Sequence, residues 1–190
     1  MSDAEQLRRL LLERSVRRGD FVLASGQRSS YYIDCRPTTM SAEGQVLIGR
    51  LGLAALQAAG WHPRAIGGLT MGADPVAYAI AAASWGSGSS IDAFSVRKEA
   101  KGHGTGRLIE GNFQAGDSVV VVEDVITSGG SAERAISAIQ EAGGRVLGVL
   151  AVVDREQGGR EHLAQLGHKV VSITTTTALG LMASAAGSAQ

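Results

Sequence analysis

The residues best suited to chemistry follow a run of four valines in the second half of the chain. Glu123 and Asp124 come directly after Val119–Val122. Four consecutive valines predict a strand that is buried on both faces, and carboxylates at the end of such a strand need either partners or a solvated crevice. We expect the crevice. Two carboxylates placed there could stabilise positive charge that develops on a substrate.

The segment after the carboxylates is suited to binding an anion. Thr127–Ser131 reads Thr-Ser-Gly-Gly-Ser, and it offers hydroxyls, backbone N–H groups and glycines that can adopt positive φ. The apolar spacing that begins at Ala132 predicts a helix, with Ser131 as its N-cap and Gly143-Gly144 at its end. A phosphate would fit the N-terminus of that helix. The alternative is a plain strand-to-helix turn with an acidic lip.

A second loop of the same form precedes it in the chain. Thr70–Ala73 follows a predicted strand and leads into Asp74-Pro75, which we interpret as an N-cap followed by a proline at the first helical position. This loop is either a second anion site or an ordinary turn between a strand and a helix.

Two further segments carry charge at the ends of predicted strands. Arg97–Gly106 contains three basic residues, one histidine and three glycines, so it is either a solvated loop or a mobile cationic lid. Arg155 follows the predicted strand 146–153. It either faces the same crevice as the other loops or forms a surface ion pair with Asp154 or Glu156.

The order of the predicted elements gives an α/β fold class. Helices are expected over residues 2–18 and 41–59, and a hairpin over Phe21–Asp34 around the turn Ser25-Gly26. Strands are expected at residues 65–69, 91–96, 119–122, 146–153 and 169–173. Because strands alternate mostly with helices, we predict a doubly wound, mostly parallel five-stranded sheet with ligands at the carboxyl ends of its strands.

Composition limits the remaining possibilities. A chain of 190 residues, 44% hydrophobic and 19% charged, suits a single domain over residues 1–190. Eighteen basic residues balance eighteen acidic ones, so no global field attracts nucleic acid or an anionic membrane. No apolar run approaches the ~20 residues of a membrane span, and the single Cys35 cannot form an intrachain disulfide. We therefore expect a cytoplasmic protein with a local anion site and no nucleic-acid or membrane partner.

The string VVVVEDVITSGGS, from Val119 to Ser131, resembles the phosphoribosyl-diphosphate (PRPP) signature of the type I phosphoribosyltransferases. The resemblance implies that family's fold, with a small N-terminal hood over about residues 1–60 and a PRPP-binding core over about 61–175. It implies that Glu123 and Asp124 meet the ribose hydroxyls and act in catalysis. It also assigns PRPP contacts to the residues that follow, which are Val125, Ile126, Thr127, Ser128, Gly129, Gly130 and Ser131.

Arg97, Lys98, Lys101 and His103 match, position for position, the Arg-Lys-x-x-Lys-x-His catalytic loop of the orotate phosphoribosyltransferases. The match implies that all four residues bind PRPP and that Lys101 and His103 are catalytic.

The hood segment Phe21–Tyr32 is similar to the hood of the same enzymes. The resemblance places Tyr31, Tyr32, Thr127 and Arg155 around orotate, with the guanidinium of Arg155 on the orotate carboxylate. The chain departs from the family at Ala24, where many members have a lysine, and in its pyrophosphate loop Thr70–Ala73, which has no basic residue.

The function implied by the resemblance is conversion of orotate and PRPP to orotidine 5′-monophosphate and pyrophosphate, in pyrimidine synthesis. Mg²⁺ would arrive with PRPP, without a dedicated cluster of protein ligands and with Asp124 as a water-mediated contact. A two-fold homodimer is also implied, in which the lid loop reaches the neighbouring site. The alternatives are a purine-type phosphoribosyltransferase, against which the lid motif and Arg155 argue, and a non-catalytic regulator that senses PRPP or nucleotides on the same fold.

Overall fold

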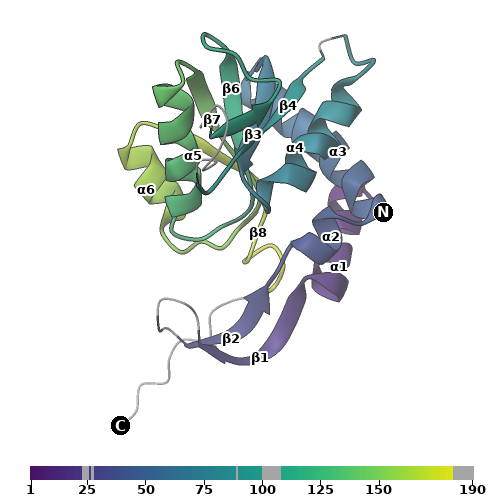
Figure 1. Cartoon of the computed structure of the whole chain (residues 1–190). Coiled ribbons are helices and arrows are strands. Elements are labelled where there is room, and N and C mark those ends of the chain that lie inside the picture. The colour runs from purple at the N-terminus through teal and green to yellow at the C-terminus, as the bar shows by residue number, and fades with distance from the viewer. Residues whose placement is uncertain (23–25, 27, 89, 100–107, 182–190) are drawn as a thin grey trace.

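The structure is a computed structural model, and it describes residues 1–22, 26, 28–88, 90–99 and 108–181. Its core is one six-stranded sheet in the order β5-β4-β3-β6-β7-β8 (Figure 1). The strands are β3 Ala65–Leu69, β4 Asp92–Val96, β5 Ile109–Gly111, β6 Ser118–Ile126, β7 Arg145–Asp154 and β8 Val170–Thr175. The central strand β6, which contains the four valines, lies between β3 and β7.

The predicted five-stranded parallel sheet is confirmed, with one strand added at its edge. Five strands pair in parallel, and β5 pairs antiparallel with β4, with Ser95 opposite Glu110. The sequence did not predict β5 because three residues are too short to show the alternation that marks a strand. Antiparallel edge strands of this kind are common on otherwise parallel sheets.

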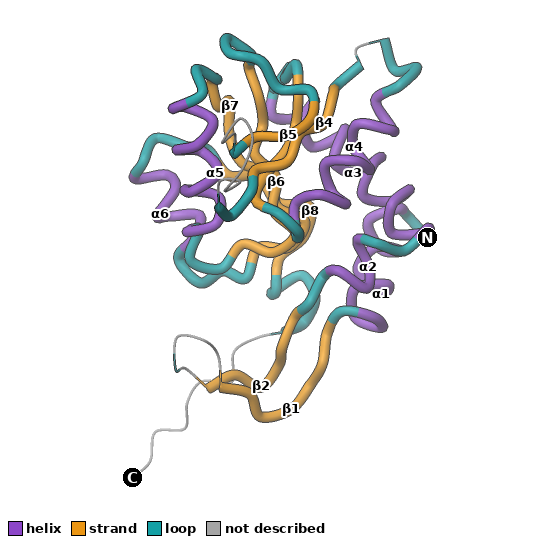
Figure 2. The backbone as a smooth tube through the Cα atoms, in the orientation of Figure 1, coloured by secondary structure: helices purple, strands orange, loops and turns teal. Residues whose placement is uncertain are grey.

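Helices cover both faces of the sheet, as Figure 2 shows. Helices α3 (Ala42–Ala59) and α4 (Ala73–Ser84) pack on one face, where Val120 and Val122 of β6 point. Helices α5 (Gly130–Glu141) and α6 (Gly159–Gln165) pack on the other, where Val119 and Val121 point. All four valines are fully buried, which is why the run can be apolar without alternation.

An N-terminal hairpin extends away from the sheet (Figure 1). It follows α1 (Asp3–Arg14) and consists of β1 (Val16–Val22) and β2 (Arg28–Ile33), paired antiparallel, and the short helix α2 (Arg36–Thr39) comes next. The hairpin prediction is confirmed. The predicted turn lies outside the described residues except for Gly26, which has φ 82°.

The first helix is shorter than its prediction over residues 2–18. Ser2 and Glu5 form the expected capping box, but the helix ends at Arg14. Ser15 is buried, its hydroxyl bonds the hydroxyl of Thr38 at 2.7 Å, and its carbonyl accepts the N–H of Asp34 at 3.0 Å. These bonds turn the chain, so that residues 16–18 pair with β2 instead of extending the helix.

Two N-cap predictions are wrong. Helix α5 begins at Gly130, after Gly129 in the left-handed conformation at φ 86°, so Ser131 lies inside the helix. Helix α4 begins at Ala73, so Asp74 lies in its first turn, where its carboxylate accepts a hydrogen bond from the hydroxyl of Ser95 at 2.7 Å. Neither helix has a side-chain cap: the left-handed Gly129 precedes α5, and Gly72, in the ordinary right-handed helical conformation, precedes α4.

In the parts of the chain that the structure describes, no helix is long and apolar enough to cross a membrane.

Candidate active site

The carboxyl ends of the parallel strands bring the predicted site residues to one edge of the sheet. The N–H of Arg155, just after β7, bonds the carbonyl of Ile126 at 3.0 Å, at the end of β6. The guanidinium of Arg155 lies over the ring of Tyr31, 5.4 Å from its centroid, so strand β2 of the hairpin is also at this edge. This is the edge at which open α/β sheets bind ligands.

Glu123 is buried at the base of the loop that was predicted to hold a phosphate. Its side chain is on the α5 face, it is 6% exposed, and its Oε1 has no hydrogen-bond partner among the described residues. Burial, helped by the negative charge of Asp124 and opposed by Arg134, raises the pKa of Glu123 to about 8. At neutral pH the group is therefore mostly a neutral acid, which can donate a hydrogen bond as well as accept one.

Asp124 points to the opposite face, because successive residues of a strand alternate. It is half-buried, and its Oδ1 accepts the N–H of Val125 at 2.9 Å. Burial raises its pKa, backbone hydrogen bonds and Arg36 oppose the rise, and the charge of Asp34 adds to it. A Cβ placed on Gly72 would lie only 2.5 Å from Oδ1, so the predicted pyrophosphate loop approaches this carboxylate closely and a larger residue would displace it.

The loop after β6 encloses a hollow of about 80 Å³. Gly129 in the left-handed conformation starts α5, and the loop rests on the beginning of α6, where a Cβ on Gly159 would lie 2.5 Å from the carbonyl oxygen of Thr127. The hollow is lined by Glu123, Val125, Ile126, Thr127, Ser128, Gly129, Gly130, Ser131 and Ala132. A small, polar, glycine-lined hollow at a helix N-terminus can hold a phosphate group.

Arg155 is 8% exposed, and its Nε and Nη2 are buried without a hydrogen-bond partner in the described chain. The ion pairs that the sequence left open as alternatives do not form. Asp154 accepts from Arg160 at 2.9 Å, and Glu156 accepts from the hydroxyl of Thr176 at 2.8 Å. A buried guanidinium with free N–H groups is costly, so it indicates a place for an anionic ligand beside Tyr31.

The two tyrosines of β2 have different surroundings. Tyr31 is buried beneath the guanidinium of Arg155, whereas Tyr32 is half-exposed and packs on Phe21, with ring centroids 5.8 Å apart. Tyr31 therefore lines the Arg155 side of the site, and Tyr32 belongs to the outer face of the hairpin.

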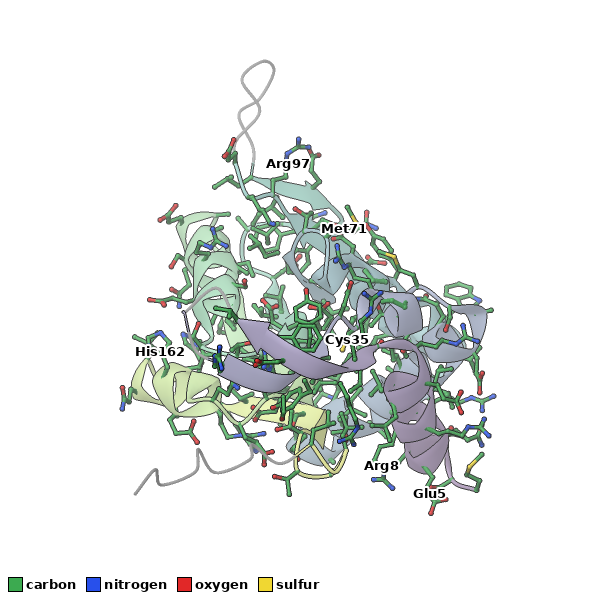
Figure 3. The ribbon with its side chains drawn as sticks, turned by 90° about the horizontal axis from the view of Figure 1, so that it is seen from below. Glu5, Arg8, Cys35, Met71, Arg97 and His162 are labelled. Carbon is green, nitrogen blue, oxygen red and sulfur yellow. The ribbon has the colours of Figure 1, made fainter. Side chains whose placement is uncertain are left out.

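The predicted lid is only partly within the described structure. The guanidinium of Arg97 lies 3.5 Å from the carboxylate of Glu110, and Lys98 is exposed. In Figure 3, Arg97 and Met71, the latter from the loop after β3, lie toward the same side of the molecule, while Cys35 lies near its centre. The sequence predictions for Lys101 and His103 concern residues outside the described ranges.

No group of three or more histidine, cysteine, aspartate or glutamate side chains in the described ranges could hold a metal ion. Mg²⁺, however, is usually bound through one or two carboxylates together with phosphate oxygens of the substrate. The carboxylate of Asp124 beside Gly72 fits that mode of binding.

A larger hollow, of about 730 Å³, lies elsewhere, between β5 with its flanking loops and the C-terminal end of α5. Its lining contains neither Asp124 nor Arg155, and none of the loop residues 127–131. The site is therefore assigned from its chemistry and not from the size of a cavity.

The structure adds Asp34 and Arg36 to the site, and the sequence analysis did not single them out. Both carry charges that act on Asp124. The available signal was the Asp-x-Arg spacing that begins two residues after Tyr32.

Comparison with known proteins gives a consistent family. The model of the phosphoribosyl transferase domain matches residues 46–174. The chain is 44% identical over 183 residues to an orotate phosphoribosyltransferase of Rhodopirellula baltica, covering 94% of this chain and 95% of that protein. It is 46% identical over 176 residues to that of Aquifex aeolicus, covering 91% and 95%.

A solved structure agrees with the sequence relatives. The crystal structure of Mycobacterium tuberculosis orotate phosphoribosyltransferase in complex with PRPP superimposes with a TM-score of 0.80 at 41% identity. The match covers 95% of this chain and all of that one.

Proposed function

Because this chain belongs to the orotate phosphoribosyltransferase family, we propose that it converts orotate and PRPP to orotidine 5′-monophosphate and pyrophosphate, a step of pyrimidine synthesis. The observation that carries the proposal is the buried guanidinium of Arg155. Its Nε and Nη2 have no hydrogen-bond partner among the described residues, and it adjoins the end of β6, where the acidic pair and the glycine-rich loop are. Orotate carries the carboxylate that such a guanidinium requires, and the purine bases do not.

PRPP binds, in this proposal, with its 5′-phosphate in the hollow formed by residues 127–131. The left-handed Gly129 exposes backbone N–H groups at the start of α5, and the helix dipole favours a negative group there. Anchoring this phosphate sets the position of the ribose over Glu123 and Asp124.

The two acids then have different tasks. Breaking the C1′–O bond leaves developing positive charge on the ribose, which a nearby carboxylate stabilises. With the pKa of Glu123 raised to about 8, that negative charge comes chiefly from Asp124. The neutral carboxyl group of Glu123 is suited to a hydrogen bond with a ribose hydroxyl, because its Oε1 has no hydrogen-bond partner in the described chain.

Orotate lies between the hairpin and the end of β7. Arg155 holds its carboxylate by a planar fork, Tyr31 fixes the guanidinium from the other side, and Thr127 offers a hydroxyl beside it. Tyr32 points to the opposite face of β2 from Tyr31, and its contact with orotate is assigned by the family resemblance alone. This geometry orients the pyrimidine nitrogen toward C1′ of the ribose.

The leaving pyrophosphate is stabilised by cations. Mg²⁺ carried with PRPP would neutralise the departing phosphate oxygens, with Asp124 as a contact through water. The family motif assigns cationic contacts with PRPP to four residues of the lid loop, which are Arg97, Lys98, Lys101 and His103. Of these, His103 acts as a proton donor. The same loop excludes water that would hydrolyse PRPP.

The assembly and location are also proposals. We expect a two-fold homodimer in which Lys101 and His103 reach the neighbouring subunit's site, and a cytoplasmic protein. Both follow from the family resemblance, and the balanced charge of the chain suits the second.

One assay tests the activity. Orotate consumption is followed by its ultraviolet absorbance with PRPP and Mg²⁺, and then after chelation with EDTA. The proposal predicts turnover that needs both PRPP and Mg²⁺. No change in absorbance with all components present would refute it.

A further inference from the structure

The side of the site where the pyrophosphate loop lies is poor in positive charge. Residues 70–73 contain no basic side chain, and the loop packs on the carboxylate of Asp124 through Gly72. Asp74 adds a second carboxylate in the first turn of α4, and Asp34 lies close enough to raise the pKa of Asp124. A diphosphate arriving here therefore meets carboxylates and needs a compensating cation from another element.

Arg36 is a cation that reaches this place. Its charge lowers the pKa of Asp124, and the charge of Asp124 in turn helps to raise the pKa of Arg36, after the larger effect of Asp34. The phenol of Tyr32 also helps to raise the pKa of Arg36. Arg36 is therefore close enough to Asp124 for their charges to interact.

The guanidinium is held in one orientation and still has donors to spare. Asp34 accepts from Nε and from Nη2 of Arg36, each at 2.8 Å, and also accepts the Arg36 backbone N–H at 3.1 Å. A guanidinium has five N–H donors, and these bonds use two of them. The Arg36 side chain is 51% exposed, so a ligand can reach the donors that remain.

The short helix that carries Arg36 is tied to the helix that follows the pyrophosphate loop. The side-chain amide of Gln45 donates to the carbonyl of Thr39, at the end of α2, and to the carbonyl of Pro75, in the first turn of α4, at 2.9 Å. Thr38 and Thr39 are fully buried. The position of Arg36 relative to the loop 70–73 is therefore set by the packing of α2.

We infer that Arg36 is a further binding residue of this site, one that holds the diphosphate group of PRPP and the released pyrophosphate, with Asp34 as the residue that positions it. The inference rests on the proposed function. Arg36, on the hood side of the site, thus supplies the cation that the loop 70–73 lacks. A preoriented guanidinium is well suited to phosphate oxygens, which it can bind through two N–H groups.

The test measures binding of inorganic pyrophosphate with saturating Mg²⁺ by titration calorimetry. Arg36→Gln removes the cation, and Asp34→Asn breaks the same ion pair but leaves the cation in place. Arg50→Gln is the matched control, since Arg50 is also an exposed arginine paired with an aspartate, Asp3, at 3.6 Å. Each variant's Tm is recorded, and Arg36→Lys restores the charge if the loss of the guanidinium disturbs the hood.

We expect Arg36→Gln to weaken pyrophosphate binding by at least tenfold. Asp34→Asn should weaken binding by less than Arg36→Gln does, because the cation stays while its orientation is no longer fixed. Arg50→Gln should bind pyrophosphate as the parent does, and Arg36→Lys should recover part of the loss. In turnover, Arg36→Gln should raise KM for PRPP and leave KM for orotate within twofold.

Two results overturn the inference. One is pyrophosphate binding by Arg36→Gln within threefold of the parent. The other is an equal loss in Arg36→Gln and Asp34→Asn, which would show that the ion pair matters for structure alone. Failure of the proposed function is a separate result, namely a parent protein that does not turn over orotate.

Discussion

Replacing Arg155 by methionine should separate stability from activity, because the residue is a buried charge whose Nε and Nη2 find no hydrogen-bond partner in the part of the chain that the structure describes. Methionine removes the charge while keeping an unbranched side chain in the same space. In the free protein the change gives up the contact with Tyr31, worth about 0.5–2 kcal/mol, and relieves the desolvation of a guanidinium, which costs several kcal/mol. The Tm should therefore stay within about 3 °C of the parent or rise.

The activity of Arg155→Met should fall. Orotate loses a charge-assisted pair of hydrogen bonds, about 1.5–4 kcal/mol, which corresponds to a decrease in kcat/KM for orotate of ~10- to 1000-fold. The KM for PRPP should change much less, because Arg155 does not line the hollow of residues 127–131. Orotate should raise the Tm of the parent and leave that of the variant unchanged.

A neighbouring arginine gives the control. Arg160 bonds the carboxylate of Asp154, which is buried, and also the carbonyl of Val170. Arg160→Met should destabilise the fold by about 2 kcal/mol, or roughly 4–8 °C in Tm, without a selective loss for orotate. If Arg155→Met instead lowers Tm by more than about 5 °C and keeps kcat/KM for orotate, Arg155 is a structural residue and the orotate site is elsewhere.

Three further predictions concern the acids and the assembly. Asp124→Asn should lower kcat by at least about 100-fold with little change in Tm, because it removes charge near the ribose at constant volume; a kcat within a few-fold of the parent would make Asp124 a structural acid. Burial raises the pKa of Glu123 from 4.5 to about 8, so the folded chain keeps a proton that the unfolded chain loses, and the free energy of unfolding falls as pH rises through this window, by at most about 1.4 kcal/mol per pH unit. Glu123→Gln should flatten that fall in chemical denaturation, and equal slopes in parent and variant would place the proton elsewhere. Mixing Lys101→Ala with Asp124→Asn should restore roughly a quarter of parental activity, because half of randomly exchanged dimers contain one intact site; no recovery after exchange confirmed by mass would confine the lid to its own subunit.

The strands of the core were predictable because their sequences are extreme. Val119–Val122 and the apolar run of β7 belong to strands buried on both faces, where solvent imposes no alternation. Ile109–Gly111 was not predictable, because its place in the sheet depends on pairing with β4 and not on its own residues. The length of α1 was overestimated for the same kind of reason, since Ser15 is fixed by Thr38 and Asp34, which are distant in the sequence.

The components of the site were predictable, but their geometry was not. The acidic pair and the glycine-rich loop are adjacent in sequence, and the structure keeps them together around one strand end. Period-two alternation puts Glu123 and Asp124 on opposite faces, yet the deep burial of Glu123 depends on α5 packing above it. The unpartnered state of Arg155 was unpredictable for a similar reason, because Arg160 on α6 takes the aspartate that Arg155 could have used.

Arg36 could not be predicted as a site residue from its neighbours in the sequence. In sequence, Asp34 and Arg36 look like an exposed pair two residues apart. In the fold, the charges of Asp34 and Arg36 act on Asp124, and Gln45 joins the end of α2 to the start of α4.

The buried guanidinium of Arg155 should select a pyrimidine that carries a carboxylate. The most direct test supplies equal concentrations of orotate and uracil with limiting PRPP and saturating Mg²⁺, and identifies the nucleotide product by mass. We expect orotidine 5′-monophosphate with little uridine 5′-monophosphate, and a loss of this preference in Arg155→Met. Comparable amounts of the two nucleotides from the parent protein would contradict it.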